Sequence, residues 1–152
     1  MEGHLDVVRY LLERGANPDI ADENGWPPLY LASQDGDLQI VQALIEKGAT
    51  INQIGDGGRT PLFLAAMEDH LDVVRYLLEH GADPNIADND GDTPLWTAMG
   101  GDNLEMVRYL LIRGANPNTA YNGETPLTFA TDNDLPEVAQ LLLENGAYVD
   151  LT

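Results

Sequence analysis

The sequence predicts an all-α fold made of tandem copies of one helical unit, because two short markers recur in phase along its 152 residues. Gly-Ala pairs recur at steps of 33, 33, 33 and 32 residues, beginning at Gly15, Gly48, Gly81, Gly114 and Gly146. A proline marker keeps the same steps in the segments "GWPPLYLA", "GRTPLFLAA", "GDTPLWTAM" and "GETPLTFAT". Between the markers, apolar residues fall at helical spacing, as in "LQIVQALIEKG".

Each copy predicts the same four parts in order: a turn-rich loop, a short helix, a tight turn and a longer amphipathic helix. The short helix begins after a threonine that can cap its free N–H groups and has proline at its first position. These threonines are Thr60, Thr93 and Thr125. The longer helix ends at a glycine, which adopts the left-handed conformation at little cost. These glycines are Gly48, Gly81 and Gly114.

This unit resembles the ankyrin repeat, whose pattern is Asp-x-x-Gly-x-Thr-Pro-Leu-His-x-Ala-Ala with a closing Leu-Leu-x-x-Gly-Ala-x-x-x-Asn. The resemblance covers essentially the whole chain, and two motifs carry it in phase. It implies an ankyrin-repeat solenoid, in which stacked antiparallel helix pairs form a curved array with projecting β-turn fingers. It also implies a concave face that binds other proteins.

The markers predict a single ankyrin-repeat domain at 1–152, with a half repeat at 1–21 and full repeats at 22–54, 55–87, 88–120 and 121–152. The opening "MEGHLDVVRYLLERGA" nearly repeats a later "MEDHLDVVRYLLEHGA", so it matches a second helix without its first helix. We expect its apolar residues to pack on the next repeat and to leave part of the N-terminal edge uncovered; they are Leu5, Val8, Leu11 and Leu12. Truncation, a natural cap and an edge that pairs with another chain remain open explanations.

The chain departs from the family pattern in its first helices and in its last finger. Pro27 replaces the first threonine of Thr-Pro-Leu, and the last finger, "AYNGE", is one residue shorter than "ADNDGD". The family's histidine is replaced by Tyr30, Phe63, Trp96 and Thr128. The family's finger asparagine, expected to set the turn, falls at Asn52, Asn85 and Asn118. The resemblance also implies Asn85 as an asparaginyl-hydroxylase target, with Leu77 eight residues upstream.

Composition narrows the classes of function. Seven basic residues against 26 acidic ones give a net charge of −19 at pH 7, which repels nucleic-acid phosphates. Without cysteine, the chain has no disulfide framework and no thiolate zinc site. No apolar run approaches the ~20 residues of a membrane helix, and residues 1–15 lack the pattern of a secretory signal. We therefore expect no nucleic-acid or membrane partner, and the cytoplasm is the default compartment.

A search for catalytic and metal-binding motifs favours structural interpretations. The segment "DNDGDT" places Asp88, Asp90 and Asp92 like the first ligands of a calcium loop. The sixth and twelfth positions of that loop hold Thr93 and Met99 instead of glycine and glutamate, so a turn is the better interpretation. No nucleophile elbow, phosphate-binding loop or zinc-protease motif occurs, and the three histidines fall at helix ends. We expect no enzyme activity, no metal and no cofactor.

Charge is distributed unevenly between the parts of each repeat. The fingers and first helices hold 15 acidic residues and one basic residue, Arg59, within residues 16–36, 49–69, 82–102 and 115–134. The second helices and the tail hold the other 11 acidic residues with six basic ones. General solubility explains this pattern, and so does a negative concave face that attracts a basic partner segment; both explanations stay open.

Aromatic residues fall in two columns of the repeat alignment. Trp26 lies on a finger, in a column where the family pattern leaves residues free to vary, and predicts a contact anchor. That column also holds Arg59, Asp92 and Glu124. The second column lies at the starts of the first helices and consists of Tyr30, Phe63 and Trp96. This second column can serve either packing between repeats or recognition of a partner, and both interpretations stay open.

These observations predict a non-catalytic protein-binding scaffold, whose acidic concave surface of fingers and first helices binds a protein with a basic segment. The candidate partner-binding residues are Trp26, Tyr30, Asp56, Arg59, Phe63, Asp90, Asp92, Trp96 and Glu124. The tryptophans are expected to anchor the partner, Arg59 to donate hydrogen bonds, and the acids to steer association. We expect a monomer. Two alternatives stay open: a structural module that self-assembles through its N-terminal half repeat, and a designed or consensus-like scaffold without a native partner.

Overall fold

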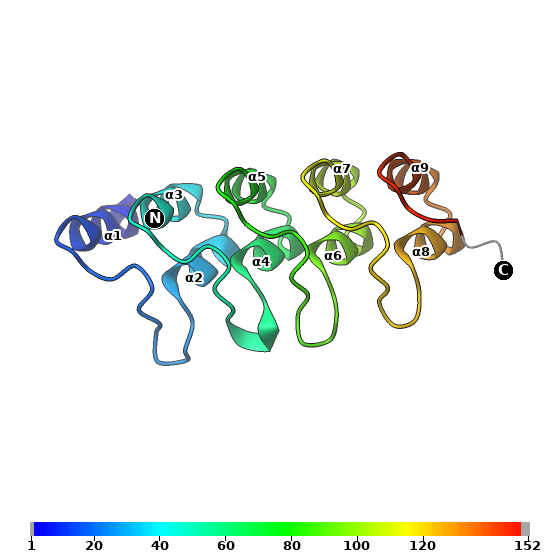
Figure 1. Cartoon of the computed structure of the whole chain (residues 1–152). Helices are drawn as coiled ribbons and strands as arrows, with labels where there is room; N and C mark the ends of the chain where they lie inside the picture. Colours follow the sequence, from blue (N-terminus) through cyan, green and yellow to red (C-terminus); the bar gives the residue numbers. More distant parts are fainter. Residues whose placement is uncertain (1, 150–152) are drawn as a thin grey trace.

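The structure, a computed structural model, describes residues 2–149, with side chains from His4 onward. These residues form two rows of α-helices, which confirms the predicted all-α repeat fold (Figure 1). The second-helix row consists of α1 (Glu2–Glu13), α3 (Leu38–Glu46), α5 (Leu71–Glu79), α7 (Leu104–Ile112) and α9 (Pro136–Glu144). The first-helix row consists of α2 (Pro28–Asp35), α4 (Pro61–Met67), α6 (Pro94–Gly100) and α8 (Pro126–Asp132). Within residues 2–149, no helix has the length and apolar character needed to cross a membrane.

Apolar side chains fill the space between the two rows and between neighbouring helix pairs. Helix α4 packs on α2, α5 and α6, so it contacts its own partner and both neighbours in its row. The most deeply buried side chains of this core include Val41, Val73, Leu77, Met106 and Leu110. Burying one such side chain stabilises a fold by about 1.5–3 kcal/mol. Because much of the burial comes from the next pair, neighbouring pairs stabilise each other.

Helix α1 packs on α3 through a single face. Leu5 and Val8 on this face are partly buried and Leu12 is buried, as predicted. The expectation that Leu11 joins them is wrong, because it shares a different face of α1 with Val7 and Tyr10 and is 50% exposed. The N-terminal edge therefore presents apolar side chains on the surface of the described residues.

The predicted caps of the first helices are confirmed. The side-chain oxygen of Thr60 accepts a hydrogen bond from the Phe63 N–H at 3.1 Å, and Thr93 and Thr125 cap α6 and α8 in the same way. Each cap satisfies a helical N–H group that would otherwise lack a partner. Pro27 holds the equivalent position before α2 and has no side-chain oxygen to offer.

The tight turn between the two helices of a pair passes through a left-handed residue. Three of the four equivalent positions are aspartates, with φ of 63°, 56° and 56°: Asp69, Asp102 and Asp134. The fourth is Gly36, with φ of 73°. The ring of His70, from the next pair, approaches Gly36 closely and its Nε2 lies 3.0 Å from the Gln34 carbonyl oxygen. His70 thus ties the α2–α3 turn to α5.

The fingers are joined by a ladder of side-chain hydrogen bonds from each repeat to the next. Asn85 shows the arrangement: its Oδ1 accepts from the Asn116 N–H at 2.7 Å and its Nδ2 donates to the Gly114 carbonyl at 3.0 Å. Asp19, Asn52 and Asn118 bridge to Thr50, Asp83 and Tyr148 at equivalent places. The finger asparagines were expected to set their own turns, and their side chains instead bridge successive repeats. Hydroxylation of Asn85 stays a prediction.

We predict that Gly36→Ala destabilises the protein more than Gly48→Ala, by an additional ~1–3 kcal/mol. Both substitutions place a side chain at positive φ, which costs about 1 kcal/mol, but a Cβ at Gly48 meets nothing within 4 Å. A Cβ at Gly36 would overlap the His70 ring. Urea unfolding of both variants measures the difference. Adding His70→Ala should remove most of the extra cost, and additive effects of the two changes would contradict this close approach.

Candidate functional site

The four fingers return to the first-helix row through equivalent backbone hydrogen bonds, which place one residue of each finger in a common column. The N–H groups of residues 22, 55, 88 and 121 donate to the carbonyl oxygens of Trp26, Arg59, Asp92 and Glu124 at 2.8–2.9 Å. The structure therefore brings these four predicted binding residues to equivalent positions, next to the starts of α2, α4, α6 and α8. Trp26, Asp92 and Glu124 are partly buried there.

The "DNDGDT" segment forms a self-contained turn. Asp88 Oδ1 accepts hydrogen bonds from the N–H groups of Asp90 and Asp92, each at 3.0 Å. Asp22 makes the same pair of bonds in the first finger, to Asn24 and Trp26 at 2.9 Å. The carboxylate of Asp88 therefore shapes its finger, and Asp90 remains exposed at the finger surface.

Arg59 is held by its neighbours at the junction between the second and third fingers. Its Nε lies 3.6 Å from Asp88 Oδ2, and its guanidinium lies 5.6 Å from the centre of the Phe63 ring. The Asp88 carboxylate is almost fully buried, whereas about a third of the Arg59 side chain remains exposed. The guanidinium thus already contacts one carboxylate and one aromatic face. The exposed part of the Arg59 side chain remains accessible to a partner.

Asp92 carries the one clearly shifted carboxyl group among the candidate residues. Burial, followed by the nearby charge of Asp88, raises the pKa of Asp92 from 3.8 to about 6. Its Oδ1 is buried and accepts no hydrogen bond from any described residue. The ionised form of Asp92 is therefore destabilised where it lies.

The aromatic column at the starts of the first helices is buried by the following repeat. The exposed fractions are 4% for Tyr30, 1% for Phe63 and 7% for Trp96. Tyr30 donates a long hydrogen bond of 3.4 Å to the Asp56 carbonyl, and the Trp96 Nε1–H donates to the Thr119 carbonyl at 2.7 Å. Most of their surface is engaged in packing between repeats, and Asp56 is exposed beside them.

A hollow opens at the junction between the third and fourth full repeats, where α6 faces α8. It has a volume of about 430 Å³ and is lined by Asp92, Trp96, Thr97, Gly100, Tyr121, Asn122, Glu124 and Phe129. Three of these residues, Asp92, Trp96 and Glu124, are predicted from the sequence, whereas the aromatic residues Tyr121 and Phe129 are not. The available signal for Tyr121 was its place in the repeat, because it stands where the earlier fingers have Asp22, Gly55 and Asp88.

We predict that Asp92→Asn stabilises the protein near pH 7.5 by about 1 kcal/mol, once partial solvent screening is allowed for. Since the pKa of Asp92 is raised in the fold, the contribution of this residue to stability is most favourable below the unfolded pKa and is lost as pH rises through about 6. The gain of the variant should therefore shrink towards zero near pH 4. Denaturant unfolding at both pH values measures it. A pH-independent gain would contradict a buried charge as the cause.

The repeat architecture agrees with comparisons to known proteins. A family model described as ankyrin repeats, in three copies, matches residues 1–88 and matches again at residues 83–152. A search of curated proteins finds no match to the chain. The two matched ranges together span all 152 residues, and the helix pairs, capped first helices and projecting fingers follow the same unit. The chain therefore belongs to the ankyrin repeat family.

Proposed function

We propose that the protein is a non-catalytic binding module that holds a basic segment of a partner protein on its fingers and first helices. Ankyrin repeats generally mediate protein–protein interaction and are typically non-catalytic scaffolds. The term finger face is used here for residues 16–36, 49–69, 82–102 and 115–134. Membership of the family does not imply that the partner is basic or that it binds to the finger face. These two statements are specific to the present proposal.

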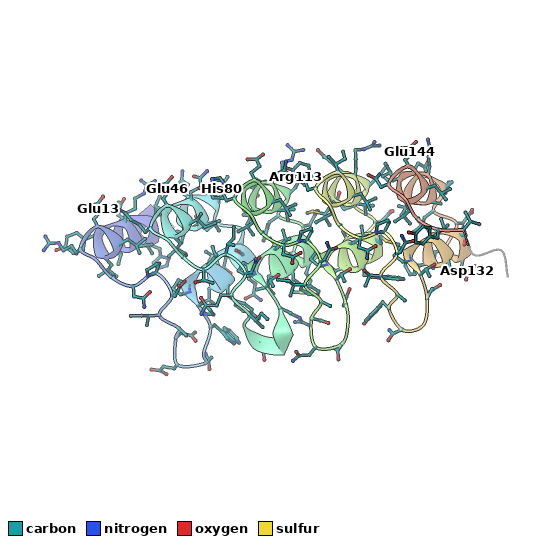
Figure 2. The ribbon with its side chains drawn as sticks, viewed as in Figure 1. Glu13, Glu46, His80, Arg113, Asp132 and Glu144 are labelled. Carbon is teal, nitrogen blue, oxygen red and sulfur yellow. The ribbon has the colours of Figure 1, made fainter. Side chains whose placement is uncertain are left out.

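The distribution of charge carries this proposal. The finger face holds 15 acidic residues and one basic residue, and that residue, Arg59, lies beside Asp88. The second-helix row holds acidic and basic residues together: Glu13, Glu46, His80, Arg113 and Glu144 project from it, on the side away from the fingers (Figure 2). A surface of one sign attracts an oppositely charged segment and raises the rate of encounter.

The shape of the finger face supports the proposal because it exists before a partner arrives. Each finger is closed by its own backbone hydrogen bonds and tied to the next by the side-chain ladder. A surface fixed in this way loses little conformational freedom on binding, so more of the contact energy remains as affinity. Exposed Asp56 and Asp90 are placed to steer the partner, and partly buried Trp26 offers an aromatic contact 5.8 Å from the Tyr30 ring.

We predict that four neutralised acids on the finger face weaken binding of a fluorescent arginine–serine repeat peptide at least about tenfold at low salt. The finger variant combines Asp56→Asn, Asp90→Asn, Asp92→Asn and Glu124→Gln. The wild-type affinity itself should fall steeply as salt rises, because exposed charges are screened over about 8–10 Å. Fluorescence anisotropy measures both effects.

A matched control variant neutralises four acids at equivalent, exposed positions of the second-helix row. It combines Glu13→Gln, Glu46→Gln, Glu79→Gln and Glu144→Gln. Both variants change the net charge by the same amount, so the control should bind nearly as well as the wild type. Equal losses in the two variants would mean that total charge, and not the finger face, attracts the peptide. No binding of the basic peptide at low salt would refute the proposed partner class.

Self-assembly through the N-terminal edge is a second candidate function, favoured by the exposed apolar residues on α1. Val7, Tyr10 and Leu11 are 56%, 54% and 50% exposed and lie on one face. Light scattering over a range of concentrations tests whether two copies pair there. Leu11→Lys should then abolish the concentration-dependent increase in mass, and a wild-type chain that stays monomeric throughout removes this candidate.

A further inference from the structure

We propose that the hollow between α6 and α8 is a pocket for one arginine side chain of the partner. This inference rests on the proposed function and names the partner residue that the finger face selects. The hairpin of the last finger, the aromatic rings of the hollow and a matching arrangement elsewhere in the chain support it.

The last finger closes as a two-residue hairpin. Tyr121 and Glu124 exchange both backbone hydrogen bonds, at 2.9 and 3.0 Å, and the turn residues Asn122 and Gly123 have φ of 51° and 81°. Two positive φ values and an Asn-Gly pair are typical of the tight type I′ hairpin turn. Tyr121 stands at the base of this finger, at the repeat position that holds Asp22, Gly55 and Asp88 in the earlier fingers.

Three aromatic rings meet in the hollow. Trp96 lies 5.6 Å from the Tyr121 ring at an angle of 52°, and 5.4 Å from the Phe129 ring at 71°. The buried Trp96 is fixed by its hydrogen bond to Thr119, whereas Tyr121 and Phe129 are partly exposed. Gly100 and Thr97 add little bulk on the α6 side. The rings thus offer faces and edges to a flat group that enters from the surface.

Two acids and no base complete the lining. Asp92 and Glu124 belong to the finger column, and both are partly buried at this junction. An aromatic face attracts a cation, and a neighbouring carboxylate adds hydrogen bonds to it. The guanidinium of arginine is planar, stacks on rings and can bind a carboxylate with two N–H groups, so it uses both features better than lysine does.

The preceding junction shows the same chemistry with an arginine of this chain. There the guanidinium of Arg59 lies over the Phe63 ring and beside the Asp88 carboxylate. Trp96 is the repeat equivalent of Phe63, and Asp92 stands in the column position of Arg59. At the junction before that, the Tyr30 ring packs against Gly55, where even a Cβ would overlap it. The third junction therefore has the aromatic and acidic groups without a basic side chain of its own.

The test uses the full chain and a lysine–serine peptide with one central arginine, compared with peptides that carry lysine or citrulline there. Lysine keeps the charge and changes the shape, whereas citrulline keeps the shape and loses the charge. We expect the arginine peptide to bind about threefold to tenfold more tightly than the lysine peptide. The difference in affinity between the arginine and citrulline peptides should be larger still. In NMR spectra, the indole N–H of Trp96 should shift more with the arginine peptide than with the lysine peptide.

Two variants of the lining should remove the preference for arginine: Glu124→Gln, and Tyr121→Leu, which keeps an apolar side chain without a π face. The matched control is Glu23→Gln, an exposed acid of the first finger. Because the readout is the ratio of the arginine and lysine affinities, a general loss of charge cancels. The control should keep the wild-type ratio.

The outcomes separate this inference from the proposed function. Equal affinities for the arginine and lysine peptides, or an unshifted Trp96 indole, would overturn the pocket while binding of both peptides still supports the basic partner. A citrulline peptide that binds as well as the arginine peptide would show that charge plays no part, and would overturn the pocket too. If no basic peptide binds at low salt, both proposals fail together.

Discussion

Burial of apolar side chains between neighbouring helix pairs is the interaction on which the rest of this protein depends. A pair such as α4 and α5 is too small to cover its own apolar surface, and Val73 and Leu77 become fully buried only within the stack. The fingers have no core of their own. They keep their spacing because the helices below them are stacked and because side chains such as Asn85 bridge to the next repeat. The arrangement of the finger face is therefore a consequence of how the repeats cover one another.

The sequence predicted most of the fold because its signals are local. The period, the threonine caps and the left-handed glycines each depend on a few consecutive residues, and the structure confirms them. The site was less predictable because exposure depends on the neighbouring repeat. Phe63 looks like a possible contact in one repeat alone, yet the next repeat leaves it 1% exposed. The pairing of Arg59 with Asp88 joins different fingers, so no single finger sequence contains it.

The third junction illustrates how a small change in a loop alters a surface without altering the fold. The last finger is one residue shorter and closes as a two-residue hairpin instead of an Asx-stabilised turn. Tyr121, at the repeat position of Asp88, lies beside Trp96. The helices on either side still begin at a capped threonine, and the asparagine of the last bridge still reaches Tyr148. The fingers contribute little to the core, so their sequences differ from one repeat to the next while the helices stay the same.

The ladder of bridges along the fingers also has a mechanical consequence. Hydrogen bonds of 2.7–3.0 Å link successive fingers through all the described repeats. In the second-helix row, hydrogen bonds join α5 to α7, from Arg75 to Glu105 at 2.8 Å and from Arg113 to the Leu78 carbonyl at 3.3 Å. Because the ladder continues along the whole array, bending of the array should preserve the spacing of the fingers.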